Sequence, residues 1–412
     1  MLKNKKKLEL IAPAGSFEKA KYALEFGADA VYLGVPEFSL RSGVNKFSEN
    51  EVKSIIEYAR EKNKKVYVTV NIFAHNRHLE PIIKFLRKIN IWKPDGITIS
   101  DPGIIVLAKK YCPKIPIGLS TQANCTNAES AKFWQKQGVK KIILARELSL
   151  REIAEIHKKV PELELEYFVH GAMCMSYSGR CLLSSYFLGR SANLGDCVQP
   201  CRWNYNFYIE EEKRKGNFLK LEEDEYGSYI LNSKDICLIK YLDDLKKAGI
   251  SSFKIEGRNK SVFYVSFVLK IYSQALRLKS KNSERKKELN KLFKQLQTLT
   301  HRDYITGFLF GKENAKQNYK ESHKITNYQF VGEVVKSIKN KVYLKVHNVI
   351  FLNDSLEIIQ PKSKTIKLKV KKMYDEDLNE IKEAHGGQNK IVILEAKNRI
   401  EKMSVVRKKI KK

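Results

Sequence analysis

Eight short apolar runs rich in β-branched residues alternate with amphipathic stretches through the first two thirds of the 412 residues. Alternation of this kind is typical of a parallel sheet with crossover helices. Eight β/α units favour a closed, TIM-like (β/α)8 barrel over an open doubly wound sheet, which stays as an alternative. The runs are LELIAP (8–13), ADAVYLG (28–34), KVYVTVN (65–71), GITIS (96–100), IPIGLST (115–121), KKIILAR (140–146), LELEYFVH (163–170) and SFKIEGR (252–258).

Small-residue turns precede three of these runs. They are FGAD (26–29), QGVK (137–140) and AGIS (248–251). A glycine just past a helix is the usual left-handed cap that leads the chain into the next strand. The turns therefore support a helix ahead of each of these strands.

Polar residues gather at the carboxyl ends of the predicted strands. In a (β/α)8 barrel the active site is built there, from the strand ends and the loops that follow. We expect His170, Glu256 and Arg258 to be catalytic, and Gln122 and Arg146 to bind substrate. The full set is Pro13, Gly15, Gly34, Asn71, Asp101, Ser120, Thr121, Gln122, Arg146, Glu147, His170, Glu256 and Arg258.

Each predicted catalytic residue also has a structural interpretation. Glu256 and Arg258 can form an ion pair with each other or with Lys254, which would serve the fold alone. His170 can donate a proton or orient a substrate, or it can simply be hydrogen-bonded inside the protein. The sequence leaves these alternatives open.

Four cysteines lie in the long connection after the seventh strand, spaced C-x6-C-x15-C-x3-C. They are Cys174, Cys181, Cys197 and Cys201. Disulfides are not expected in a reducing compartment, so the cluster predicts a metal or iron–sulfur site. Paired C-x2-C knuckles, usual in zinc ribbons, are absent from the sequence. The spacing therefore favours an iron–sulfur cluster, of the [4Fe–4S] kind, over zinc, with unrelated buried cysteines as the third alternative.

Three arginines near this motif and the three remaining cysteines are weaker candidates for binding residues. Arg180, Arg190 and Arg202 follow within the same stretch and predict an anion site, although each alone is more often a surface residue. Cys112, Cys125 and Cys237 are expected to be small buried hydrophobic residues. Cys237 stays an alternative to Cys201 as the fourth ligand.

The chain divides into a larger and a smaller domain. Residues 1–300 hold the barrel, with an insertion over 171–250 and a lysine-rich helical stretch over 261–300 whose charges we expect to face solvent. Residues 301–327 are a predicted linker. Over 328–412, five or six short strands without helices predict a small β-barrel.

Charge points to a polyanionic partner. The chain has 77 Lys and Arg against 46 Asp and Glu, a formal net charge of +31, and residues 328–412 alone have 20 against 10. This balance favours nucleic acid over an anionic membrane as the partner. The alternatives are a lysine-rich proteome, which would explain the charge of the whole chain, and an inert charged lid, which would explain that of residues 328–412. No apolar run approaches about 20 residues, and the first residues lack a signal peptide, so we expect a cytoplasmic protein.

Four segments carry a resemblance to a known family. They are LIAPAGSFEKAKYALEFGADAVYLG near the amino terminus, the central EYFVHGAMCMSYSGRCLLSSYF, then CVQPCRW and KIEGR. Together they resemble the collagenase-like peptidases, the thirty-second family of peptidases of unknown catalytic type. The match spans the whole chain, and its central cysteine motif is highly specific.

The resemblance implies a function in RNA modification. The family's better characterised members hydroxylate ubiquinone, ribosomal RNA cytidine or transfer RNA uridine, and this chain looks most like the transfer RNA branch. That branch implies prephenate-dependent formation of 5-hydroxyuridine at the wobble position, in the anticodon loop of tRNA, and a cysteine-bound iron–sulfur cluster. The alternatives are a peptidase, for which the sequence shows no H-E-x-x-H motif or recognisable triad, a ribosomal RNA cytidine hydroxylase, and a non-catalytic RNA-binding or assembly protein.

Overall fold

The structure is a computed structural model of the chain. It describes most of both predicted domains, and the gaps fall mainly in the cysteine-containing insertion and between the domains. The described residues are 8–39, 47–173, 181–203, 207–210, 212, 215–216, 219–221, 234–311, 314, 326–387 and 391–410.

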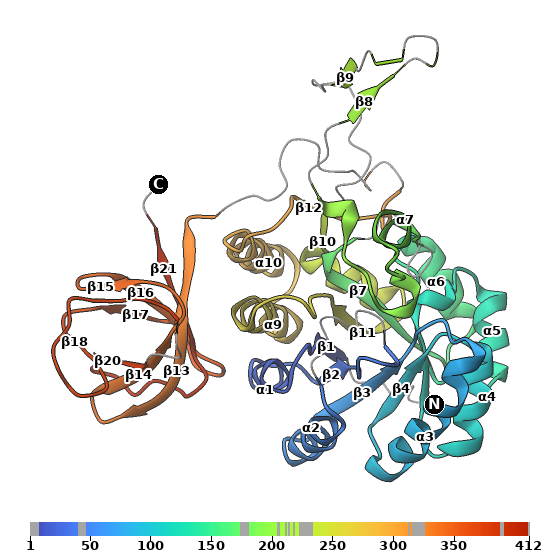
Figure 1. Cartoon of the computed structure of the whole chain (residues 1–412), viewed down its shortest axis with the longest axis horizontal. Coiled ribbons are helices and arrows are strands. Elements are labelled where there is room, and N and C mark those ends of the chain that lie inside the picture. Colours follow the sequence, from blue (N-terminus) through green and yellow to red (C-terminus); the bar gives the residue numbers. More distant parts are fainter. Residues whose placement is uncertain are drawn as a thin grey trace.

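Eight parallel strands close into a barrel, which confirms the predicted fold (Figure 1). They are β1 (Glu9–Pro13), β2 (Ala30–Leu33), β3 (Lys65–Val70), β4 (Gly96–Ile99), β5 (Ile117–Leu119), β6 (Lys141–Ile143), β7 (Glu164–Ala172) and β11 (Ile250–Ile255). Each pairs in parallel with its neighbours, and β11 closes the ring by pairing with both β7 and β1.

Helices surround this barrel. They are α1 (Phe17–Glu25), α2 (Glu49–Glu61), α3 (Asn76–Trp92), α4 (Pro102–Tyr111), α5 (Ala128–Lys136), α6 (Leu150–Lys159), α8 (Leu242–Lys247), α9 (Val262–Arg277) and α10 (Asn282–Leu296). Ser48 and Ser149 begin α2 and α6 with full capping boxes, which satisfy amide groups that a helix start leaves open. Gly27, Gly138 and Gly249 adopt φ values of +106°, +87° and +102°, which confirms the three predicted glycine turns.

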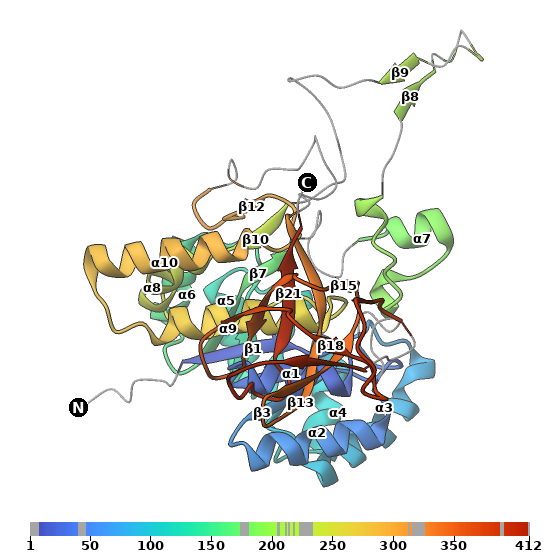
Figure 2. The ribbon, with the colours of Figure 1, turned by 90° about the vertical axis from the view of Figure 1, so that its left-hand side faces the viewer.

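The prediction of a solvent-facing helical stretch over 261–300 is wrong for its first half. The stretch forms two helices, and α9 is buried on nearly all sides, Lys270 included. The reason is that α9 lies between the barrel and the C-terminal domain (Figures 1 and 2). Its sequence is accordingly apolar all round, as in a core helix. Most of the charged residues of α10 do face solvent.

The long connection after β7 contains more structure than a loop. Its described part includes β10 (Asp235–Cys237), which adds to the barrel sheet antiparallel to β7. Residues of the predicted linker join it, because β12 (Tyr304–Ile305) pairs in parallel with β10. The other short elements of the connection are α7 (Leu183–Leu188), η2 (Ala192–Leu194), η3 (Pro200–Arg202), β8 (Phe207–Ile209), β9 (Leu219–Leu221) and η4 (Ile239–Tyr241). Outside it, η1 (Thr121–Ala123) follows β5.

The C-terminal domain is an antiparallel sheet that curls into a partly closed barrel (Figure 1). Seven strands follow the order β17-β16-β21-β13-β14-β20-β18. Its elements are β13 (Tyr328–Ile338), β14 (Lys341–Val346), β15 (Ile350–Phe351), β16 (Ser355–Ile359), β17 (Ile366–Lys369), β18 (Met373–Tyr374), β19 (Glu383–Ala384), β20 (Ile391–Glu395) and β21 (Val405–Lys409). Strand β21, whose run VVRKK contains three basic residues in five, is not among the strands predicted from the sequence.

The two domains share a packed interface built on α9. The ring of Phe263 stacks on Phe330 with centroids 5.2 Å apart. Arg407 of β21 places its guanidinium carbon 4.6 Å from the Phe267 ring centroid, and its Nη1 donates to the hydroxyl of Thr298 at 2.6 Å. Such contacts hold the C-terminal domain against the side of the barrel. No helix within the described ranges is long and apolar enough to cross a bilayer.

Candidate active site

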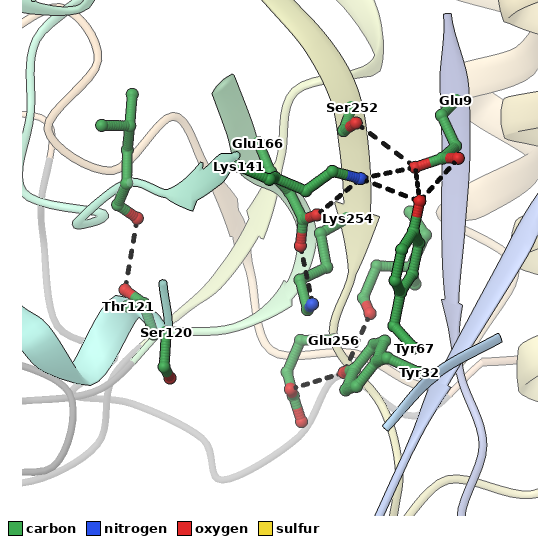
Figure 3. Close-up of polar contacts among 12 residues, drawn as sticks. Glu9, Tyr32, Tyr67, Ser120, Thr121, Lys141, Glu166, Ser252, Lys254 and Glu256 are labelled. Atoms are coloured by element: carbon green, nitrogen blue, oxygen red, sulfur yellow. Dashed lines mark hydrogen bonds and ion pairs between the residues drawn. The ribbon is translucent and has the colours of Figure 1, made fainter. Parts of the chain in front are cut away.

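A chain of buried charges runs inside the barrel (Figure 3). Lys141 Nζ lies 2.7 Å from Glu9 Oε2 and 3.7 Å from Glu166 Oε2. Glu166 accepts a hydrogen bond from Lys254 Nζ at 2.7 Å, and Tyr67 donates its hydroxyl to Glu9 at 3.0 Å. Barrel interiors are normally filled by branched apolar side chains. We call Glu9, Lys141, Glu166 and Lys254 the interior ion network.

The members of the interior ion network influence one another's charge. Burial opposes ionisation of Glu9, but Lys141 outweighs it, so the pKa of Glu9 stays below its usual value. Burial also opposes the charge of Lys141, yet Glu166 and Glu9 raise its pKa above the ordinary range. For Lys254 burial prevails over Glu166, and its pKa is lowered. The charge of Lys254 therefore depends on keeping its carboxylate partner Glu166.

Tyr32 connects this network to the mouth, the carboxyl end of the barrel. Lys254 Nζ lies 3.9 Å from the centroid of the Tyr32 ring, and the Arg258 guanidinium carbon lies 5.6 Å from it. The Tyr32 hydroxyl donates toward Glu256 Oε2 at 3.1 Å. The structure thus brings the predicted residues Glu256 and Arg258 together around Tyr32. Lys254 forms its ion pair with Glu166.

A second group of polar residues follows β5. Asn71 Nδ2 donates to Ser120 Oγ at 3.2 Å, and the same hydroxyl accepts from the backbone N–H of Gln122 at 3.4 Å. Thr121 Oγ1 donates to the backbone carbonyl of Leu144 at 3.2 Å. Figure 3 shows Ser120 and Thr121 toward the end of the barrel that also holds Glu256, away from Glu9.

Arg146 and Glu147 stand at the end of β6. Arg146 is buried, its Nη1 donates to the backbone carbonyl of Ala172 at 2.8 Å, and its guanidinium carbon lies 5.0 Å from the Phe168 ring centroid. Burial raises the pKa of Glu147 despite the neighbouring Arg146. The mouth therefore carries two buried guanidinium groups, those of Arg146 and Arg258, close to strand ends, where they can attract an anion.

His170 points out of the barrel. The pairing of β7 with β11 shifts register just before His170, and the imidazole packs on the rings of Tyr264 and Tyr272 in α9 and of Tyr304 in β12, with centroids 5.9, 5.4 and 5.5 Å away. Burial lowers its pKa to about 3, so the ring is neutral at physiological pH. This placement favours the structural interpretation over proton donation.

Three of the four predicted cluster ligands lie in the described insertion. Cys181 precedes α7, Cys197 lies between η2 and η3, and Cys201 is within η3; all three are partly exposed. Helix α7 packs against both η2 and η3, and Ser184 Oγ approaches Cys197 Sγ at 3.9 Å. The fourth residue, Cys174, is outside the described residues.

The predicted arginines of the insertion do not form a described anion site. Arg190 is engaged in a two-bond ion pair with Asp196, with Nε donating to Oδ2 at 2.8 Å. Arg180 lies outside the described residues, and so does the side chain of Arg202. The ion pair supports the interpretation of Arg190 as a surface residue and not as part of an anion site.

The described cysteines supply only part of a metal centre. Within the described ranges, no group of three or more Cys, His, Asp or Glu side chains is arranged to hold a metal ion. Partly exposed thiols on mutually packed segments are nevertheless the ligand type that iron–sulfur clusters use. The donor chemistry of Cys181, Cys197 and Cys201 therefore fits the predicted cluster, and the complete ligand geometry depends on Cys174.

Family models match both domains. The model described as peptidase family U32 covers residues 15–319, and the model of the peptidase family U32 C-terminal domain covers residues 326–407. The chain belongs to peptidase family U32. This membership confirms the family resemblance drawn from the four sequence segments.

Several relatives of this U32 protein are named as tRNA hydroxylation proteins. Escherichia coli tRNA hydroxylation protein P is 39% identical over 395 residues, covering 86% of each chain. Bacillus subtilis tRNA hydroxylation protein P1 is 36% identical, covering 91% of this chain and 89% of that protein. Both spans are long enough to include the barrel and much of the C-terminal domain.

Two further U32 relatives have names that correspond to the alternative functions. The 23S rRNA 5-hydroxycytidine C2501 synthase of Escherichia coli is 36% identical, but the match covers 66% of this chain and only 39% of that protein. A Porphyromonas gingivalis collagenase is 30% identical, covering 80% of each chain.

Tyr32 and most of the interior ion network of this U32 protein are not among the site residues predicted from the sequence. A signal was present, because the strands LELEYF and SFKIEGR place glutamate and lysine at every second position. Parallel barrel strands are usually apolar on both faces. Charged residues at every second position therefore indicate that one face of each strand is polar. In the closed barrel this face points to the interior.

The two classes of cysteine in this U32 protein predict different thiol reactivity. Burial raises the pKa of Cys112 and Cys125 to about 11 and that of Cys237 to about 12. At about pH 8, iodoacetamide should leave these three unlabelled in the native protein, because the thiolate is the reactive form. Cys181, Cys197 and Cys201 are partly exposed, and they should react in protein that has been treated with a chelator.

Peptide mass spectrometry measures this labelling, with denatured protein as the control in which every cysteine reacts. Labelling of Cys237 as fast as Cys181 in the native state would contradict the buried assignment. It would also restore Cys237 as a candidate cluster ligand.

Proposed function

We propose that this protein hydroxylates a transfer RNA uridine at C5, in the wobble position, with prephenate as co-substrate. The observation that carries the proposal is the 39% identity to a tRNA hydroxylation protein across 86% of both chains. The polar barrel mouth supports it, because a modification enzyme must present charged groups to a base that has left its stack. An anticodon loop offers such a base without opening a duplex.

Basic residues of the C-terminal domain are suited to the RNA backbone. Lys367 and Lys369 are exposed on β17, the edge strand of the sheet, and the exposed Lys371 and Lys372 follow it. Charged edge strands also prevent unwanted strand pairing, so these lysines serve the fold as well. Phosphate contacts of this type make RNA affinity fall steeply as salt concentration rises.

The mouth residues have distinct proposed roles. Glu256, oriented by the Tyr32 hydroxyl at 3.1 Å, is the carboxylate placed to take up and return a proton at the mouth during the reaction. Arg146 and Arg258 supply guanidinium groups for the two carboxylates of prephenate. His170 supports the strand from outside the barrel.

We propose that Cys174, Cys181, Cys197 and Cys201 hold an iron–sulfur cluster of the [4Fe–4S] kind. When bound, such a cluster would supply one-electron transfer. The support is the specific cysteine motif and the partial exposure of the three described thiols.

Nucleoside mass spectrometry tests the function. A bacterial strain lacking its own tRNA hydroxylation proteins is complemented with this chain, and tRNA is digested and analysed. We expect 5-hydroxyuridine derivatives to return with the wild-type chain and not with a Cys181→Ala, Cys197→Ala variant. An unchanged tRNA profile combined with new 5-hydroxycytidine in ribosomal RNA would replace this proposal with the ribosomal alternative.

Cluster content is measured separately. Anaerobically purified protein should absorb broadly near about 400 nm and contain iron and sulfide. Stoichiometric zinc in colourless protein would exclude the cluster. Peptide cleavage that survives alanine at the cysteines would instead support the peptidase alternative.

A further inference from the structure

The side-chain amide of Gln122 is buried without a partner. Gln122 lies in η1, directly after β5, and is 1% exposed. Within the described residues, neither its Nε2 nor its Oε1 makes a hydrogen bond. Its backbone is held firmly, because the N–H donates to Ser120 Oγ at 3.4 Å and the carbonyl accepts from Asn124 Nδ2 at 3.0 Å. The backbone of Gln122 is thus fixed directly after β5, at the carboxyl end of the barrel, and both polar atoms of its buried amide are unsatisfied.

Such an arrangement destabilises the free protein. A buried amide loses its bonds to water, and the loss is offset only when protein groups replace them. The same chain shows the usual solution at Gln360, which is 3% exposed. There Nε2 donates to the Lys364 carbonyl at 2.8 Å and Oε1 accepts from the Glu401 N–H at 3.0 Å. An orphaned amide at a strand end therefore points to a ligand as the missing partner.

The amide also defines the chemistry of that ligand. It offers a donor and an acceptor side by side in one plane. A carboxylate or phosphate only accepts and would leave Oε1 unsatisfied. The imide edge of uracil satisfies both atoms, because N3–H can donate to Oε1 while O4 accepts from Nε2.

We propose that Gln122 binds the target uracil by its imide edge. This inference rests on the proposed function and adds to it the group that holds the base. Flipped bases are commonly recognised through this Watson–Crick edge. Held in this way, the base turns its opposite edge, C5 and C6, away from Gln122 toward the rest of the mouth. The amide is covered in the free protein, so the base reaches it only when the mouth opens.

Gln122→Met tests the inference because methionine has a similar size and no hydrogen-bonding amide. We expect the variant to melt higher than wild type by about 1 °C or more, since an unsatisfied amide has been removed. In complemented cells with equal protein levels, 5-hydroxyuridine in tRNA should fall at least about tenfold.

Gln360→Met is the matched control. It removes an amide that is fully hydrogen-bonded inside the protein, so it should melt lower than wild type and still support 5-hydroxyuridine formation within about twofold at equal protein level. If Gln122→Met also melts lower, or leaves 5-hydroxyuridine unchanged, the inference is wrong.

A binding measurement separates this inference from the proposed function. The full-length protein is titrated with an anticodon stem-loop RNA carrying uridine or 3-methyluridine at the wobble position. The methyl group removes the N3–H donor, so wild type should bind the methylated RNA at least about fivefold more weakly, and Gln122→Met should bind both RNAs equally. Equal binding by wild type would overturn the inference. A wild-type chain that discriminates between the RNAs yet forms no 5-hydroxyuridine would overturn the proposed function alone.

Discussion

Glu166→Gln should lower the free energy of unfolding by about 3–5 kcal/mol, the usual cost of leaving one member of a buried ion pair without its partner. Glu166 is the carboxylate between two lysines, 2.7 Å from Lys254 Nζ and 3.7 Å from Lys141 Nζ. Glutamine keeps the size and removes the charge. Thermal or chemical denaturation followed by circular dichroism measures the change.

The loss should depend on pH in a defined direction. Burial already lowers the pKa of Lys254, and Glu166 opposes that shift, so the variant should lower the pKa of Lys254 further. The unfolded chain keeps this proton up to about pH 10.4, whereas the folded variant releases it earlier. Between the two pKa values the unfolded state binds more protons, so the stability of Glu166→Gln should rise with pH over a wider range than that of wild type.

A second substitution provides the control for this prediction. Adding Lys254→Met to Glu166→Gln removes the unpaired charge, and should recover most of the lost stability and the extra pH dependence. A double variant no more stable than Glu166→Gln would show that the loss arises from packing. The charge interpretation would then be wrong.

The barrel was predictable from local chemistry. Alternating strands and helices, glycine caps such as Gly138 and polar strand ends are each encoded within a few residues, and the structure confirms them. The burial of α9 was missed because residues 261–300 were treated as one lysine-rich stretch, whereas α9 itself is apolar and contains only Lys270 among the lysines of that stretch. The partner of Lys270 was not predictable locally, because its Nζ donates to the Ser363 carbonyl of the C-terminal domain at 2.6 Å, 93 residues away in sequence.

The candidate site was predictable in position and less so in orientation. Glu256, Arg258, Arg146 and Gln122 do reach the mouth, because strand ends of a closed barrel converge. His170 also ends a strand, yet the register shift between β7 and β11 turns it outward. A shift of one residue reverses the face of a side chain, and no local sequence signal marks it.

The interior ion network and the mouth are physically continuous. Lys254 contacts Glu166 on one side and the Tyr32 ring on the other, and Tyr32 donates toward Glu256. A charged interior costs stability relative to an apolar one, so its presence is best explained by what it does at the mouth. It fixes Tyr32, and through Tyr32 the carboxylate of Glu256.

Glu256→Gln should therefore reduce the rate of 5-hydroxyuridine formation by about 100-fold or more, the lower end of the range for loss of a general base. Glutamine can still accept the Tyr32 hydrogen bond, so the mouth should keep its shape, but it cannot take up a proton. Affinity for tRNA should stay within about twofold, because phosphate contacts dominate it. Single-turnover formation of 5-hydroxyuridine and RNA titration measure the two quantities.

Two variants show whether the effect belongs to the mouth. Glu164→Gln makes the same chemical change at the amino end of β7 and should leave the rate within about twofold, since Glu164 is far from any strand end that forms the mouth. Tyr32→Phe removes only the hydroxyl that orients Glu256, and should slow the reaction about tenfold, whereas Tyr67→Phe, which removes a hydroxyl bonded to Glu9, should not. If Glu256→Gln retained half the wild-type rate, the proton acceptor would have to be another residue, and Glu147, whose pKa burial raises, would be the next to test.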